Sequence, residues 1–331
     1  MASSMGAGAL FKMVSSGVDV RKVQAHVRKP FRFFLCGDPA LVAEFRALML
    51  SGQTDEALAL EAAACLETLD SNAPAARSAA PDARAIVFLG RKTDASDAHL
   101  AHLEPLKLPI LALTVDDTAV PSAPASAPAP GSWAEYVVPE ISRDALRKTV
   151  FPHLIECSHG VEIAVGRRLC PLREAAAAKL TRDASGNALK VALASAVVDH
   201  IPIVGVVLGA VASAGDTVVI TALQMMLLLQ IQATYGKDPD VQRMWQLLPV
   251  IGGGLGWRAL ARELVGFVPM AGIPIKGAIA YAGTIVVGEG VAFFLENGKH
   301  MSKVQASALY ERTKNDAMQF ARDVIGKLRG N

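Results

Sequence analysis

Short apolar runs recur along the first half of the chain and alternate with segments of helical periodicity. The first run begins at Phe31, the next two are 84–90 and 108–115, and a last short run lies in 133–140. Continuous apolar runs of this length are typical of strands in a parallel sheet that is covered on both faces. The spacing therefore predicts a doubly wound α/β domain.

From about residue 156 the strand-like runs end and long apolar helices follow. This change predicts three parts: a lead-in helix within residues 1–30, an α/β domain at 31–155 and an all-α domain at 156–331. A chain of 331 residues is long enough for each half to bury its own core.

The stretch 31–52 predicts a strand, a turn and a helix. Gly37, Asp38 and Pro39 interrupt the apolar pattern, and Asp38 suits the helix N-cap while Pro39 suits the first helical position. Further helices are expected at 57–69, where a short strand is the alternative, and at the segments 95–107 and 141–156. The Pro-, Ala- and Ser-rich tract 120–131 predicts an extended surface loop.

The second half is organised around the segment 201–236. It carries a single charged residue, Asp216, at its expected turn, and it is long enough to span a bilayer as a helix. Gln224, Gln230 and Gln232 would need partners for their amides in such a helix, which favours a hairpin packed against other helices. A glycine-rich apolar stretch follows from residue 247 to 295, and the final segment 300–329 is a polar helix.

Composition and charge narrow the classes of function. The net charge is +2, from 33 basic and 31 acidic residues, so bulk electrostatics give no reason to expect a nucleic-acid partner. The four cysteines form no CxxC pair, and the first 30 residues lack a continuous apolar core, so we expect reduced thiols and a cytoplasmic position for most of the chain.

The turn at Gly37 is the first candidate for chemistry. A phosphate-binding loop of the form GxxxxGK[ST] uses backbone amides, a lysine and a hydroxyl to hold phosphates and magnesium. When the motif is aligned on Gly37 and Asp38, its later positions are Val42, Ala43 and Glu44, so the second glycine, the lysine and the hydroxyl are all missing. The base-reading NKxD pattern is likewise replaced by the segment 114–117, in which Asp117 is more simply a turn residue. We therefore expect that the chain binds neither a nucleotide nor another cofactor. A protein without catalytic activity is the favoured interpretation.

Two further sets of residues are candidates for a site. The first set has side chains that commonly bind metals and comprises His153, Cys157, His159 and Cys170. Their spacing matches no compact metal site, so packing is the simpler interpretation and we expect no metal. The second consists of polar residues within the apolar half, which suit either an ion or headgroup path or, more simply, caps and salt bridges; it comprises Asp216, Gln224, Arg258, Glu263, Lys276 and Glu289.

The segments ALQ, YG, GGGLG and KGAIAYAGT between residues 188 and 298 resemble the bacterial domain of unknown function DUF697, also found in inner-membrane proteins of the YcjF type. Members often carry this domain behind a Ras-like GTPase domain, and the stretch from Phe31 to the run at 133–138 looks like such a domain in its strand order. The resemblance implies a degenerate GTPase-like module joined to a membrane-associated helical domain of apolar hairpins. It supplies no known reaction.

These observations predict a non-catalytic scaffold or sensor, in the cytoplasm and peripheral to or inserted in the bacterial inner membrane. Its expected partners are a lipid surface or bilayer and a protein bound by the α/β domain, with a homo-oligomer as a further possibility. Two alternatives stay open: a divergent GTP-binding protein or other NTPase, and a soluble, self-associating helical protein that binds a partner.

Overall fold

The computed structural model describes residues 19–69, 80–91, 100, 102–194, 216–240 and 273–329. The chain forms two compact units. One, here called the α/β unit, comprises Ala25–Lys179 and Ala233–Lys237; the other, the helical unit, comprises Met1–Gln24, Leu180–Gln232 and Asp238–Asn331. The boundary predicted at residue 155 thus lies inside the α/β unit.

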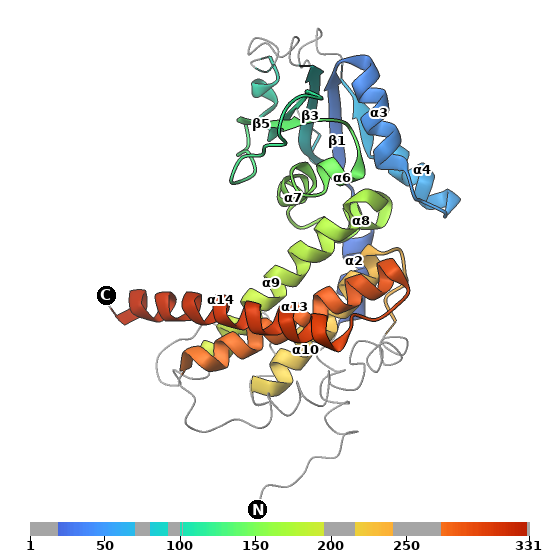
Figure 1. The fold of residues 1–331 in the computed structure, drawn as a ribbon. Helices are drawn as coiled ribbons and strands as arrows, with labels where there is room; N and C mark the ends of the chain where they lie inside the picture. Colours follow the sequence, from blue (N-terminus) through green and yellow to red (C-terminus); the bar gives the residue numbers. More distant parts are fainter. Residues whose placement is uncertain are drawn as a thin grey trace, which may run out of the picture. The chain divides into compact units, whose positions relative to one another are not determined.

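The α/β unit is built on a sheet of five parallel strands in the order β2-β1-β3-β4-β5 (Figure 1). The strands are β1 (Arg32–Gly37), β2 (Leu66–Thr68), β3 (Ala83–Arg91), β4 (Ile110–Val115) and β5 (Trp133–Val138). The predicted α/β class with a parallel sheet is confirmed. This order is one of the two common doubly wound orders and has its reversal between β1 and β3.

Both faces of the three central strands, β1, β3 and β4, are buried, which explains why these strands have no polar alternation. On one face, Phe33, Leu35, Val87 and Leu89 belong to a core shared with the helices. On the other face, alternate residues such as Phe34 and Ile86 pack with Leu100 and Leu103. Successive strand residues point to opposite faces, so a strand that is covered twice must be apolar throughout.

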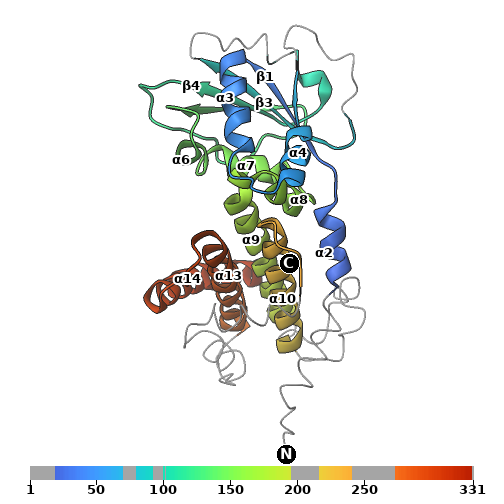
Figure 2. The same ribbon diagram turned by 90° about the vertical axis from the view of Figure 1, so that its right-hand side faces the viewer.

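Helix α3 (Pro39–Leu50) lies along one face of the sheet (Figure 2). Its buried residues are Leu41, Val42, Phe45 and Met49, at the spacing of one helix face. The segment predicted as one helix at 57–69 contains both predicted alternatives: α4 (Glu56–Ala64) is followed by the edge strand β2. In the crossover helix predicted at 95–107, residues 95–99 and 101 lie outside the described residues; the described end of the segment holds the 3-10 turn η1 (Glu104–Leu106).

The helix predicted at 141–156 is divided into α6 (Arg143–Leu146) and α7 (Val150–Glu156). Ser142 caps α6 as expected, because its hydroxyl accepts a hydrogen bond from Ala145 N at 3.3 Å. Pro152 explains the break, since a proline has no N–H for the carbonyl four residues earlier and is tolerated only in a first turn. After α7 come α8 (Glu162–Arg168), the turn η2 (Cys170–Leu172) and α9 (Arg173–Ala194).

The Pro-rich tract runs along the outer edge of the sheet. Ser122 forms an antiparallel bridge with Val137 of β5, with N···O distances of 2.9 and 3.0 Å. The remainder of the tract to Gly131 has no helix or strand, as predicted for a surface loop.

The lead-in helix α2 (Val20–Val27) precedes β1. The later described helices of the helical unit are α9 beyond Lys179, α10 (Asp216–Thr234), α13 (Ile273–Asn297) and α14 (Lys303–Arg329). Ala188 and Ala192 of α9 pack with Ile220 of α10 and Ala280 of α13. Helices α13 and α14 lie side by side (Figures 1 and 2). The first arm of the hairpin predicted at 201–236 lies outside the described residues, and the second arm is α10.

One helix among the described residues is long and apolar enough to cross a bilayer. It spans Gly277–Asn297 in α13, with a mean hydropathy of 1.8 and 61% of its most apolar window buried. The core helix of a soluble protein has the same properties, so length and composition alone do not place this helix in a membrane. The segment Val219–Thr234 of α10 is apolar but shorter.

Candidate functional site

The end of β1 lies directly against β3. Asp38 N donates a hydrogen bond to Leu89 O at 2.8 Å. Gly37 has a φ of +111°, and a Cβ at this position would overlap the carbonyl oxygen of Leu89. Only glycine is compatible with both the φ angle and the close approach. The glycine that resembles the start of a phosphate-binding loop is therefore required here by strand packing.

The first turn of α3 uses its own side chain to satisfy its amides. The Asp38 carboxylate accepts hydrogen bonds from Ala40 N at 2.8 Å and Leu41 N at 3.1 Å, and Pro39 has no N–H. A phosphate at a helix N-terminus needs these same donors, and the carboxylate would also repel it. As predicted, Asp38 is the N-cap and Pro39 the first residue of the helix.

The later positions of the aligned loop lie within α3 and do not converge. Val42 is buried in the core, whereas Ala43 and Glu44 are exposed on the helix. A single residue, Asp38, separates β1 from α3, so the chain contains no loop between them that could wrap a phosphate.

The segment in place of the base-reading pattern forms a turn after β4. Asp116 accepts hydrogen bonds from Thr118 N at 3.0 Å and Thr118 Oγ1 at 2.6 Å. Asp117, the residue singled out in the sequence, is exposed, and the turn is instead held by its neighbour. Thr114 at the end of β4 donates to Glu135 at 3.3 Å.

The four residues with metal-ligand chemistry serve packing and capping. His153 Nδ1 lies 2.8 Å from the hydroxyl of Tyr136, and His159 is exposed and 3.7 Å from Glu162. Cys157 ends α7 and Cys170 is buried in η2. Burial raises the pKa of the Cys157 thiol to about 12, so it stays protonated near neutral pH. Within the described ranges no group of three or more His, Cys, Asp or Glu side chains is placed to hold a metal ion.

The polar residues of the helical unit are only partly brought together. Gln224 of α10 is 2% exposed and donates from Nε2 to Thr284 Oγ1 of α13 at 3.2 Å, as expected for an amide that needs a partner helix. Asp216 begins α10, Lys276 lies in the first turn of α13 and Glu289 is exposed on α13. Arg258 and Glu263 lie outside the described residues.

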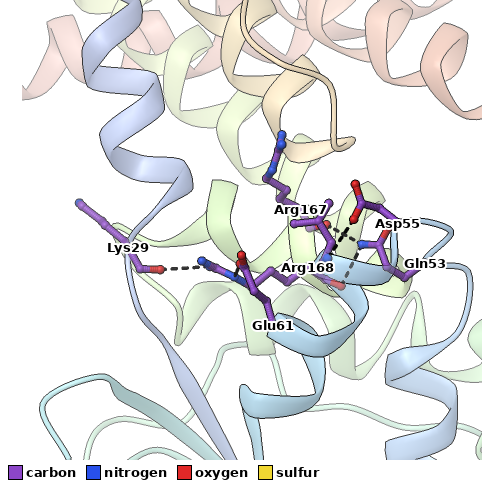
Figure 3. Close-up of polar contacts among 7 residues, drawn as sticks. Lys29, Gln53, Asp55, Glu61, Arg167 and Arg168 are labelled. Carbon is purple, nitrogen blue, oxygen red and sulfur yellow. Dashed lines mark hydrogen bonds and ion pairs between the residues drawn. The ribbon is translucent and has the colours of Figure 1, made fainter.

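Two adjacent arginines at the end of α8 make contacts that the sequence analysis did not anticipate (Figure 3). Arg167 Nη1 donates to the backbone oxygen of Lys237 at 3.1 Å and to that of Ala233 at 3.5 Å. Both carbonyls lie at the C-terminal end of α10 or just after it, in the segment Ala233–Lys237 of the α/β unit. A cation at a helix C-terminus is favourable. Gly236, with a φ of +81°, completes this helix end.

Arg168 points away from this contact and binds the connection between α2 and β1 (Figure 3). Its Nη1 donates to Lys29 O at 3.2 Å and its Nε to Glu61 Oε2 of α4 at 2.7 Å. Lys29 Nζ in turn donates to Gly160 O at 2.9 Å. Gln53 Nε2 donates to the backbone oxygen of Arg167 at 3.1 Å. The end of α8 is thus a junction of four segments of the α/β unit.

The signal for this junction was a pair of arginines after the fully buried run Glu162–Gly166. Consecutive charged residues in a short buried helix need partners, because an unpaired buried charge is costly. That signal says that partners exist but not which segments supply them.

Comparison of the chain with protein-family models, with curated proteins and with solved structures finds no match. The resemblance to the DUF697 domain and the GTPase-like character of the α/β unit therefore stay predictions.

Proposed function

We propose that the chain is a non-catalytic scaffold or sensor at a membrane. In this proposal the α/β unit is a GTPase-like module that has lost its nucleotide site and presents a surface to a protein partner, while the helical unit docks on or in the lipid. The observation that carries the proposal is the Asp38 carboxylate, which occupies the amides of Ala40 and Leu41 that a phosphate would need.

The helical unit supports the membrane part of the proposal. The span Gly277–Asn297 has the length and hydropathy of a bilayer-crossing helix, and Gln224 Nε2 donates to Thr284 Oγ1 between helices, as polar groups in apolar bundles do. Small residues permit close helix contact in the same bundle, since Gly288 of α13 packs directly against Thr181 of α9.

Carbonate extraction of bacterial membranes tests the membrane part. We expect the full-length chain to stay in the membrane pellet, or to leave it only with carbonate if it is peripheral. A chain that stays in the soluble fraction at low and high salt, and crosslinks to itself in lysate without detergent, would instead be a self-associating soluble protein.

Calorimetric titration with GTP, GDP and ATP in the presence of magnesium tests the loss of the nucleotide site. We expect no binding tighter than about a millimolar dissociation constant, a threshold of about 4 kcal/mol. The Asp38→Ala variant frees the two amides but supplies no lysine and no hydroxyl, so it too should not bind. Micromolar binding by the unaltered chain would revive the NTPase alternative.

A further inference from the structure

A pocket with a volume of about 680 Å³ opens at the amino ends of β1, β2 and β3, within the α/β unit. Ligand sites of open α/β sheets usually lie at the carboxyl ends, so this pocket is separate from the turn at Gly37. Its volume is in the range of small-molecule sites. Its lining residues are Val27, Arg28, Pro30, Phe31, Arg32, Leu58, Glu61, Ala64, Cys65, Asp82, Arg167 and Arg168.

The pocket combines an apolar wall with fixed guanidinium groups. Phe31, Leu58 and Ala64 are among the apolar lining residues. Arg168 lies with its guanidinium carbon 5.6 Å from the centre of the Phe31 ring, and its side chain is only 13% exposed. An apolar wall beside a few placed polar groups is the usual composition of a ligand site.

Arg168 is oriented by its contacts but retains a donor. Nε is bound to Glu61 and Nη1 to Lys29 O, whereas Nη2 has no hydrogen bond to any described residue. Because its contacts with Glu61, Lys29 O and the Phe31 ring already fix this guanidinium, it loses little conformational freedom when it binds an anion.

Arg28 supplies a second guanidinium at the mouth of the pocket. Its side chain is exposed and makes no ion pair within the described ranges. The donors of the other lining arginines are engaged: Arg32 pairs with Glu67 and Asp82, and Arg167 binds the carbonyls at the end of α10. Arg28 is therefore the lining guanidinium that is most open to an anion from solvent.

Glu61 competes with any anion for Arg168. Its side chain is 52% exposed, and its negative charge at Nε offsets part of the positive charge that an anion at Nη2 would meet. A doubly charged group that contacts two guanidiniums attracts Arg168 more strongly than the single charge of the Glu61 carboxylate does.

We propose that this pocket binds a phosphate monoester carried on an apolar group, with the phosphate between Arg28 and Arg168 and the apolar group against Phe31 and Leu58. Both a soluble ester and the headgroup of phosphatidic acid have this chemistry. The site does not depend on the membrane function proposed above.

Calorimetric titration of the full-length chain with phenyl phosphate tests the proposal, with inorganic phosphate as the probe that lacks an apolar group. We expect phenyl phosphate to bind with a dissociation constant of about a millimolar or tighter, and more tightly than inorganic phosphate. Arg28→Gln should weaken binding by about threefold to tenfold, and Glu61→Gln should strengthen it by a similar factor because the competing carboxylate is gone.

Lys148→Gln is the matched control, since Lys148 is an exposed cation of the same unit that does not line the pocket. It should leave the affinity unchanged. Arg28 and Glu61 are both exposed, so neither variant should prevent folding. Failure of the unaltered chain and of Glu61→Gln to bind phenyl phosphate at about 10 mM, or equal affinities for all variants, would overturn the proposal.

Vesicles of phosphatidylcholine with and without phosphatidic acid distinguish the two sources. If the ligand is the lipid, phosphatidic acid should increase binding to vesicles, and Arg28→Gln should remove that increase while Lys148→Gln does not. If it is a soluble ester, phenyl phosphate should bind and phosphatidic acid should add nothing.

Discussion

Gly288 of α13 contacts Thr181 of α9 so closely that a Cβ on the glycine would lie 2.9 Å from the Cβ of the threonine and would overlap its two terminal atoms. A second contact of the same kind joins Gly277 of α13 to Leu189 of α9, at 2.6 Å from the leucine Cδ1. Chain order rises along one helix as it falls along the other, so the two helices pack antiparallel through glycines.

Gly288→Ala should therefore destabilise the helical unit by about 1–3 kcal/mol, since overpacking forces the helices apart. Thr181→Ala removes the two terminal atoms, so the double variant should regain part of this loss. Urea unfolding of both single variants and the double variant measures the coupling. Gly186→Ala is the control, because a Cβ there meets nothing within 4 Å. Additive effects would contradict the contact.

Gly37→Ala should destabilise the α/β unit by about 2–4 kcal/mol, because it combines a strained positive φ with overlap on the Leu89 carbonyl. Thermal unfolding followed by circular dichroism measures the loss. A change below about 0.5 kcal/mol would show that β1 and β3 do not approach as described.

Asp38→Ala should cost about 1 kcal/mol through loss of the N-cap of α3, whereas Asp38→Asn should retain most of the stability because its amide oxygen still accepts. Urea unfolding separates the two variants. Equal losses would mean that the charge, rather than the hydrogen bonds to Ala40 and Leu41, stabilises the turn.

Arg167→Gln should increase hydrogen exchange of the amides in 233–237 by roughly tenfold, because a hydrogen bond from a charged donor contributes about 1.5 kcal/mol. Exchange measured by mass spectrometry tests this. Arg147→Gln is the control: it removes an arginine that pairs with Glu174 on the surface and should leave this segment unchanged.

The thiols should titrate far above neutral pH. Burial raises the pKa of Cys36 to about 12 and that of Cys65 to about 11, against an ordinary value of 9.0. Thiolate absorbance should accordingly appear near these values in the folded chain and near 9 after denaturation. Because the pKa of Cys36 is raised in the folded chain, the contribution of the buried thiol to folding stability is fully present below pH 9. It is lost between about pH 9 and 12, as the thiol ionises. Rapid reaction of Cys36 with a thiol reagent at pH 8 would contradict its burial.

The strands that the sequence predicted are those that consist of continuous apolar runs, such as β3 and β4. Strand β2 is only one of the two alternatives that the sequence predicts at 57–69, because its three residues directly follow a helical stretch. Its identity comes from pairing with Phe33 of β1, a partner that local periodicity does not reveal.

The candidate site was predictable only where it depends on neighbours in the chain. The cap at Asp38 follows from residues within three positions, and it was predicted. The contact of Lys29 with Gly160 joins residues 131 apart, and that of Gln224 with Thr284 joins residues 60 apart. Periodicity shows which residues are buried, but distant pairs are set by how the elements meet.

The bridge between Ser122 and Val137 affects how the molecule behaves at high concentration. A bare edge strand recruits strands from other chains, and this is a common origin of aggregation. At one border of the sheet, the tract 120–131 pairs with β5 through Ser122, and its four prolines lack the N–H donors that a new strand would need. At the other border, β2 is only three residues long. The sheet thus offers little backbone to a strand of another chain, so we expect the α/β unit to resist edge-to-edge association.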